Sequence, residues 1–197
     1  AVVEKKVTKS TMATGLTHHH GRDPGPPGLA KGTDVLVTPA ERKERAVQLY
    51  VDMDGVLADF DRHHEEVFGV KPCKIADNVD WAKIRAVKDF YLNIPPMPDF
   101  DALWDRIKHH KPIVLTGIPS SVAEAAENKR AWARKHLGEH VEVRCCRSKE
   151  KSLHAKPGDI LIDDWTKYQS LWERVGGLWI THTSAAETAK ALDELGL

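Results

Sequence analysis

The stretch "QLYVDMDGVLADFD", residues 48–61, decides the fold of this chain. An apolar run ends at two aspartates, Asp52 and Asp54, and a glycine and a second apolar run follow them. A short apolar run between polar residues indicates a buried strand. Asp and Gly are also common turn residues after strands, so the motif by itself is explained equally well by a plain turn.

The rest of the chain alternates between short apolar runs and amphipathic helical patterns. Strands are predicted over residues 47–52, 112–116, 141–146, 159–163 and 177–182. Helices are predicted over residues 99–110, from Ser120 or Ser121 to just before Gly138, over 168–175, and after a capping box of Ser184 and Glu187. Strands that alternate with helices predict an α/β fold, a three-layer α/β/α core with a central parallel sheet.

Polar residues follow three of the predicted strands, at the edge where active sites of such sheets gather. They are Asp52 and Asp54, Thr116 and Gly117, and Asp163 and Asp164. Four carboxylates at one edge repel one another unless a divalent cation neutralises them. Oxygen ligands without a nearby Cys/His pattern favour Mg²⁺ over zinc.

This set of residues can carry out phosphoryl chemistry. An aspartate can attack phosphorus and form an aspartyl-phosphate. A second carboxylate two residues along can protonate the leaving oxygen and later activate water. The hydroxyl of Thr116 and the backbone N–H groups near Asp54 and Gly117 can bind phosphate oxygens, and a lysine is needed to offset the phosphoryl charge. The ordered set DxDGV, LTG, lysine, LIDD is far more specific than DxDG alone.

The same set resembles the haloacid dehalogenase-like phosphohydrolases, with "DMDGVLADF" as their first motif, "VLTG" as the second and "LIDDW" as the fourth. The resemblance covers roughly residues 47–195 and implies a Rossmann-like core with a small helical cap inserted after the first strand. Three stretches look most like the 5′(3′)-deoxyribonucleotidase branch and its bacterial and phage relatives: "FYLNIPPMPDFDALW" (90–104), "NKRAWARKHLG" (128–138) and "KEKSLHAKPGDILIDDWTKYQSLWERVGGLWITHTS" (149–184).

The resemblance implies a Mg²⁺-dependent phosphomonoesterase that hydrolyses (deoxy)nucleoside monophosphates through an aspartyl-phosphate. Asp52 is then the nucleophile and a metal ligand. Asp54 is the general acid/base, with its backbone carbonyl on the metal, and Thr116 binds the phosphoryl group. Asp164 is implied as a metal ligand, with Asp163 beside it either as another ligand or as its partner.

The lysine of the set has more than one candidate. Lys151 matches the family position best, and Lys149 lies two residues away. Lys129 lies on the apolar stripe of the helix before Gly138, so its side chain is expected to point towards the sheet. There it either reaches the phosphate or covers core with its stem. Arg147 is a further candidate for contact with the anion.

The implied cap runs from about residue 62 to 97 and is expected to contain two or three short helices. Its aromatic residues are Phe68, Trp81, Phe90 and Tyr91. These rings either hold the cap together or bind substrate. We take Trp81, Phe90 and Tyr91 as candidates for a substrate pocket in which one ring stacks on a nucleobase, a contact worth about 1–3 kcal/mol.

Residues 1–45 differ in composition from the domain expected over 46–197. They are rich in Gly and Pro around 21–32 and hold eight Lys and Arg against five Asp and Glu, which indicates a flexible, mildly basic arm. For the three histidines at 18–20 a solvated loop is favoured over a metal site, because no second ligand cluster accompanies them.

Composition argues against several other classes of protein. The formal net charge is zero and no apolar run reaches about 18 residues, so neither nucleic acid nor membrane is favoured as a partner. The first residues lack the apolar core of a signal peptide, and three cysteines, two of them adjacent, form no disulfide framework. A cytoplasmic protein is expected. The resemblance implies that its partner is a small phosphomonoester.

Two alternatives stay open at this point. The same chemistry could act on a polynucleotide 3′-phosphate or a sugar phosphate, with the basic arm holding a nucleic acid strand in the first case. The chain could also be a non-catalytic binding protein on the same scaffold, although every residue that the chemistry needs is present.

Overall fold

The computed structural model describes residues 46–72 and 79–197, which belong to one compact unit. The predicted arm over residues 1–45, with its three histidines, lies outside the described residues, as does the part of the predicted cap at 73–78.

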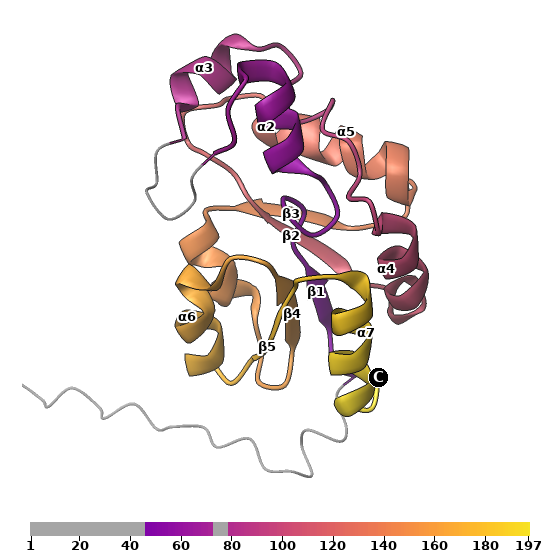
Figure 1. The fold of residues 1–197 in the computed structure, drawn as a ribbon. Coiled ribbons are helices and arrows are strands. Elements are labelled where there is room, and N and C mark those ends of the chain that lie inside the picture. The colour runs from indigo at the N-terminus through magenta and orange to yellow at the C-terminus, as the bar shows by residue number, and fades with distance from the viewer. Residues whose placement is uncertain (1–45, 73–78) are drawn as a thin grey trace, which may run out of the picture. The chain divides into compact units, whose positions relative to one another are not determined.

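Five parallel strands form the central sheet, in the order β3-β2-β1-β4-β5 (Figure 1). They are β1 (Leu49–Val51), β2 (Ile113–Gly117), β3 (Val143–Cys146), β4 (Ile160–Asp163) and β5 (Leu178–Thr181). Each lies within one of the predicted strands or extends one residue beyond it, so the predicted α/β fold is confirmed. Because β1 lies in the middle, paired with both β2 and β4, the residues that follow these three strands are neighbours.

Six α-helices accompany the sheet in the described residues: α2 (Phe60–Phe68), α3 (Trp81–Ala86), α4 (Phe100–Ile107), α5 (Ala125–Leu137), α6 (Gln169–Arg174) and α7 (Ala185–Glu194). Three 3₁₀ turns add η1 (Lys108–His110), η2 (Ser148–His154) and η3 (Thr166–Tyr168). None of the helices in this part of the chain is both long and apolar enough to cross a membrane.

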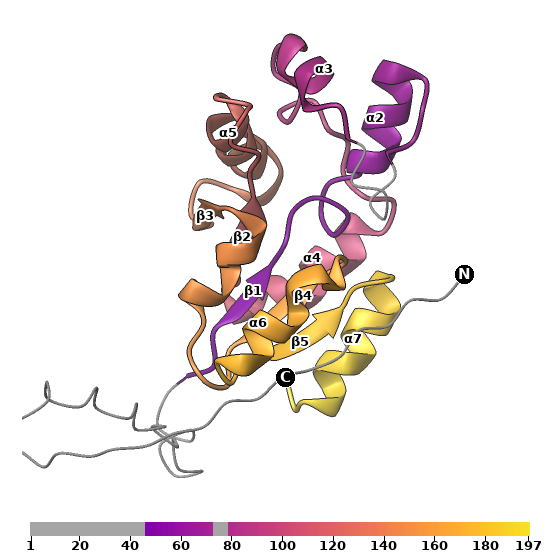
Figure 2. The same cartoon turned by 90° about the vertical axis from the view of Figure 1, so that its left-hand side faces the viewer.

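Alternating side chains of the strands divide the core between two layers of helices. Leu49 and Val51 pack with α4, α5 and α7, whereas Tyr50 packs with Trp172 of α6 on the other face. Figures 1 and 2 show α6 and α7 on opposite sides of the sheet. The three-layer arrangement therefore follows from the period-2 pattern of β1, whose three residues are all buried.

One helix begins later than the sequence predicts. α5 starts at Ala125, after Glu124, and not at Ser120 or Ser121. The side chain of Glu124 accepts a hydrogen bond from the backbone N–H of Asp89 (3.0 Å), so it holds the cap connection and does not cap its own helix. The serines stay in the loop that leaves β2.

The helices α2 and α3 and the turns after them form the small cap between β1 and β2, above the sheet in Figure 1. Its interior is aromatic: the ring centroids of Phe60 and Phe90 lie 5.8 Å apart, and those of Phe68 and Phe90 also 5.8 Å. The indole N–H of Trp132, on α5, donates to the carbonyl of Ile94 (2.7 Å) and ties the end of the cap to the core.

Candidate active site

The loop after β1 places two carboxylates at the carboxyl edge of the sheet. The backbone N–H of Asp52 donates to the carbonyl of Ile162 on β4 (2.9 Å), and Met53 is fully buried between the two aspartates. Gly55 has φ +81°, and a Cβ at this position would collide with the carboxylate of Asp164. Only glycine combines this backbone conformation with such a close approach.

Three carboxylates converge at this point. One oxygen each of Asp52, Asp163 and Asp164 lies within 4.8 Å of the other two, and the first two side chains are buried. An all-oxygen set of this kind suits a hard divalent cation. Of the four carboxylates that the sequence placed at this edge, three therefore converge in the structure, and Asp54 is not one of them.

A buried lysine pairs with two of these carboxylates. Nζ of Lys151, on η2, lies 2.9 Å from Oδ1 of Asp52 and 2.7 Å from Oδ2 of Asp163. Burial by itself lowers the pKa of Lys151, but the two carboxylates outweigh it and leave the pKa raised. Burial, and then the negative charge of Asp52, raise the pKa of Asp163.

A second lysine holds the other aspartate of the opening motif. Nζ of Lys129, on α5, donates to Oδ2 of Asp54 (2.7 Å), Oγ1 of Thr116 (2.9 Å) and the carbonyl of Gly117 (2.7 Å). Its side chain points inward, as the helical stripe predicts, and is fully buried. It also lies 4.8 Å from the ring centroid of Tyr91.

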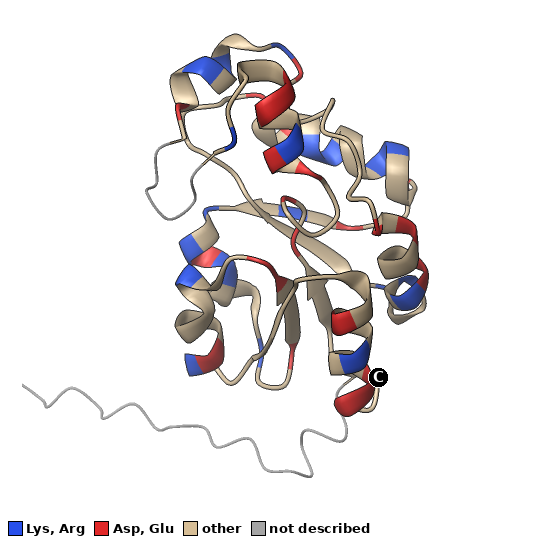
Figure 3. Cartoon of the chain, in the orientation of Figure 1, with Lys and Arg blue, Asp and Glu red and all other residues tan. Residues whose placement is uncertain are grey.

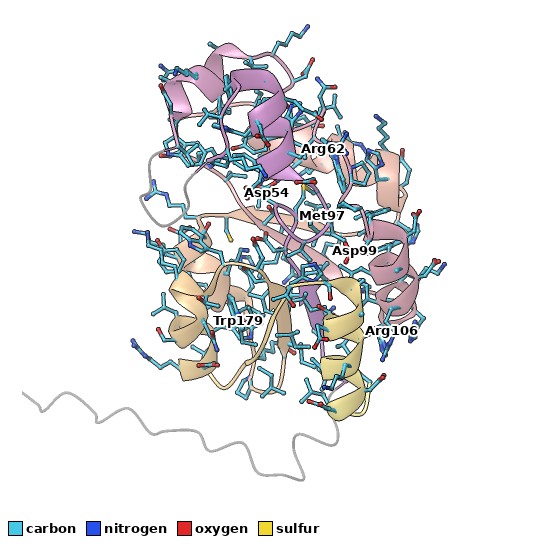
Figure 4. The ribbon with its side chains drawn as sticks, in the orientation of Figure 1. Asp54, Arg62, Met97, Asp99, Arg106 and Trp179 are labelled. Atoms are coloured by element: carbon cyan, nitrogen blue, oxygen red, sulfur yellow. The ribbon has the colours of Figure 1, made fainter. Side chains whose placement is uncertain are left out.

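A cavity of about 420 Å³ opens above the carboxylates, and Asp52, Asp54 and Asp164 all line it. Figure 4 shows Asp54 between the cap and the sheet. Trp81 and Tyr91 line the cavity from the cap, as predicted. Phe90 is not among the lining residues.

Phe90 is instead fully buried, with its ring 4.7 Å from that of His63 between centroids. It holds the cap together, which was the other role foreseen for these aromatic residues.

The basic residues near η2 occupy different places. Lys151 is buried at the carboxylates, whereas Arg147 and Lys149 are exposed and line the cavity. The position matched by the family resemblance is thus the one in contact with Asp52. Thr116 and Gly117 lie beside this site, and Gly117 also lines the cavity.

Several lining residues were not predicted from the sequence. Among them are Ser120, Ser121, Ser148, Trp165, Lys167 and Tyr168. These six follow directly after a strand end or after the turn beyond it, and that position is the signal that could have found them. The side chain of Ser148 occupies the space that a Cβ on Gly117 would need.

Comparison with known proteins finds similarity to a phage protein that is named as a deoxyribonucleotidase. No model of a known protein family matches it. It is 27% identical over 121 residues to the "Putative 5'(3')-deoxyribonucleotidase" of Vibrio phage KVP40, a match over 60% of this chain and 66% of the relative. The predicted resemblance to 5′(3′)-deoxyribonucleotidases and their phage relatives is confirmed as a resemblance. The match to the phage protein spans just under two thirds of that relative's length.

One solved structure with a similar outline is a haloacid dehalogenase-superfamily hydrolase from Ehrlichia chaffeensis. It is 12% identical, with a TM-score of 0.45, and the overlap covers 76% of this chain and 97% of that one.

Proposed function

We propose that this protein is a Mg²⁺-dependent phosphomonoesterase that hydrolyses (deoxy)nucleoside monophosphates through an aspartyl-phosphate. The observation that carries the proposal is the convergence of Asp52, Asp163 and Asp164 within 4.8 Å at the edge of the sheet, two of them on the floor of the cavity. The similarity to the phage protein supports the substrate class. A cavity of about 420 Å³ lies in the range of small-molecule sites.

The donor set fits a magnesium ion. Both oxygens of Asp163 are engaged, one by Nζ of Lys151 and the other by the backbone N–H of Trp165 (2.8 Å). We therefore assign Asp52 and Asp164 as the direct ligands, together with the backbone carbonyl of Asp54, and Asp163 as the residue that positions Lys151. When bound, Mg²⁺ supplies Lewis-acid polarisation of a phosphoryl oxygen.

The protein's own groups can divide the reaction into two displacements. The carboxylate of Asp52 attacks phosphorus, the ester P–O bond breaks, and the leaving oxygen takes a proton from Asp54. Water then attacks the aspartyl-phosphate and gives a proton to Asp54, and inorganic phosphate leaves with Asp52 restored. The ammonium of Lys129, 2.7 Å from Asp54, offsets the charge that Asp54 acquires in the first step.

A lysine, a hydroxyl and backbone N–H groups orient the reacting atoms. Lys151 holds Oδ1 of Asp52 at 2.9 Å and can offset negative charge on the phosphoryl group as it transfers. In this proposal the hydroxyl of Thr116, which accepts a hydrogen bond from Lys129, and the backbone N–H groups around Gly117 bind the phosphate oxygens.

The test is the Asp52→Asn variant, which keeps the shape of the side chain and removes the nucleophile. Release of phosphate from dCMP, dUMP and dTMP in Mg²⁺ is expected to fall to the background rate, while Asp101→Asn, an exposed aspartate on α4, keeps the parent rate. Phosphate release by Asp52→Asn at the parent rate would refute the mechanism. No release from any phosphomonoester by the parent protein, with Mg²⁺ present, would favour the non-catalytic alternative.

A further inference from the structure

The cavity has an uneven distribution of charge that the proposed mechanism does not use. Six charged residues line it, and three of them are the aspartates of its floor. The other three are all basic: Arg147, Lys149 and Lys167. We call these three residues the basic wall. Basic segments mark the ribbon at η2, below the cap, in Figure 3.

Two aspartates of the floor already have buried lysine partners outside the basic wall. Lys151 already pairs with Asp52 and Asp163, and Lys129 with Asp54, both at 2.9 Å or less. The formal net charge of the whole chain is zero, so three cations that line one cavity are a local concentration. Such a concentration raises the local potential for an anion.

Aromatic rings lie next to the basic wall. The ring centroids of Trp165 and Tyr168 are 5.6 Å apart, and Nζ of Lys167 lies 5.0 Å and 5.5 Å from them. Both rings line the cavity, and Trp81 lines it from the cap. The cavity therefore combines a carboxylate floor, aromatic rings on which a base can stack, and the basic wall beside two of these rings.

We propose that the basic wall binds a second phosphate of the substrate, so that a nucleoside 3′,5′-bisphosphate is preferred to a monophosphate. This inference rests on the proposed phosphatase function. One water and one ester bond are consumed, one phosphate is released at Asp52, and the product keeps the phosphate that the wall holds. The cavity, about 420 Å³, suits a single nucleotide, so a free bisphosphate is favoured over a nucleic acid strand.

The first test compares kcat/KM for thymidine 3′,5′-bisphosphate and thymidine 5′-monophosphate. The parent protein is expected to prefer the bisphosphate by about tenfold or more, since exposed charge pairs contribute modestly and two or three act together. The Lys149→Gln/Lys167→Gln variant should lose most of that preference. The control, Lys108→Gln/Lys135→Gln, removes two exposed charges from helices that do not line the cavity and should keep it.

The preference should also fall as salt rises, because the wall is exposed to solvent. Equal kcat/KM for the two substrates in the parent protein overturns the inference and leaves the phosphatase proposal standing. The same ratio in both double variants also overturns it, because the wall would then play no part.

A binding experiment keeps the inference separate from failure of catalysis. Calorimetry with the Asp52→Asn protein in Mg²⁺ measures affinity for the monophosphate, the bisphosphate and a single-stranded trinucleotide with a terminal 3′-phosphate. Tighter binding of the bisphosphate, lost in Lys149→Gln/Lys167→Gln, supports the inference even if no substrate is turned over. Equal affinities contradict it, and tightest binding of the trinucleotide assigns the wall to a strand and overturns the bisphosphate.

Discussion

Replacing Lys129 with methionine removes one buried ammonium and keeps most of the volume of the side chain. Nζ of Lys129 is the donor in three hydrogen bonds, to the carboxylate of Asp54, the hydroxyl of Thr116 and the carbonyl of Gly117. Methionine refills the space beside the sheet but supplies none of these donors. The substitution therefore isolates the electrostatic role of Lys129 from its packing.

The expected loss of stability follows from the burial of the pair. Removing one partner of a buried ion pair lowers the free energy of unfolding by about 3–5 kcal/mol, because the other charge stays buried where water solvates it poorly. The side chain of Lys129 is 1% exposed and that of Asp54 is 27% exposed, so water solvates part of the remaining charge. We expect the low end of that range, about 3 kcal/mol.

Unfolding in urea, followed by tryptophan fluorescence with divalent metal chelated, measures this loss. Lys135→Met, an exposed position on the same helix, should change stability by no more than about 0.5 kcal/mol. Adding Asp54→Asn to Lys129→Met removes the stranded charge, so the double variant should be more stable than the sum of the single losses predicts by about 1 kcal/mol or more. Additive losses, or a Lys129→Met protein as stable as Lys135→Met, would refute the reasoning.

Three further outcomes are expected. Gly55→Ala should abolish phosphatase activity and destabilise the fold by about 1–3 kcal/mol, because a Cβ would collide with Asp164. The control is Gly69→Ala, which is also at positive φ but has open space around it and should keep activity. Equal activities of the two variants would contradict the collision. Mg²⁺ should raise the Tm of the parent protein but not of Asp164→Asn, and identical shifts would exclude Asp164 as a ligand. Burial lowers the pKa of His63 below its usual 6.5, so the unfolded chain binds more protons and the free energy of unfolding should fall as pH drops below about 6.5. In urea titrations, His63→Phe should therefore lose less stability than the parent protein between pH 7.5 and 5.5. An unchanged pH dependence would argue against this role of His63.

The sequence by itself determined the fold class and the edge of the sheet where the site lies. Buried parallel strands have sequences that are short apolar runs, and such runs can be recognised from neighbouring residues alone. The polar residues that end three of those runs are equally local, and parallel strands must bring their carboxyl ends to one edge. The sequence alone therefore places Asp52, Thr116 and Asp163 together.

The partners of the two lysines were decided only by the tertiary structure. Lys129 and Asp54 are 75 residues apart, and the distance between their charged atoms depends on the order of the strands and on how α5 packs against the sheet. Lys149 and Lys151 differ by two positions in the chain, yet one is exposed at the cavity and the other is buried against Asp52. The turn of η2 makes that difference, and no local pattern in the sequence reports it.

The division of the cap aromatics was likewise a tertiary outcome. Phe90 and Tyr91 are adjacent and both almost fully buried, but only Tyr91 lines the cavity. Hydrophobicity predicts that such rings are buried and cannot predict against what, because that depends on which surfaces α2, α3 and α5 bring into contact. The basic wall also depends on the tertiary structure, since its members come from segments after β3 and β4 that meet only when the sheet has formed.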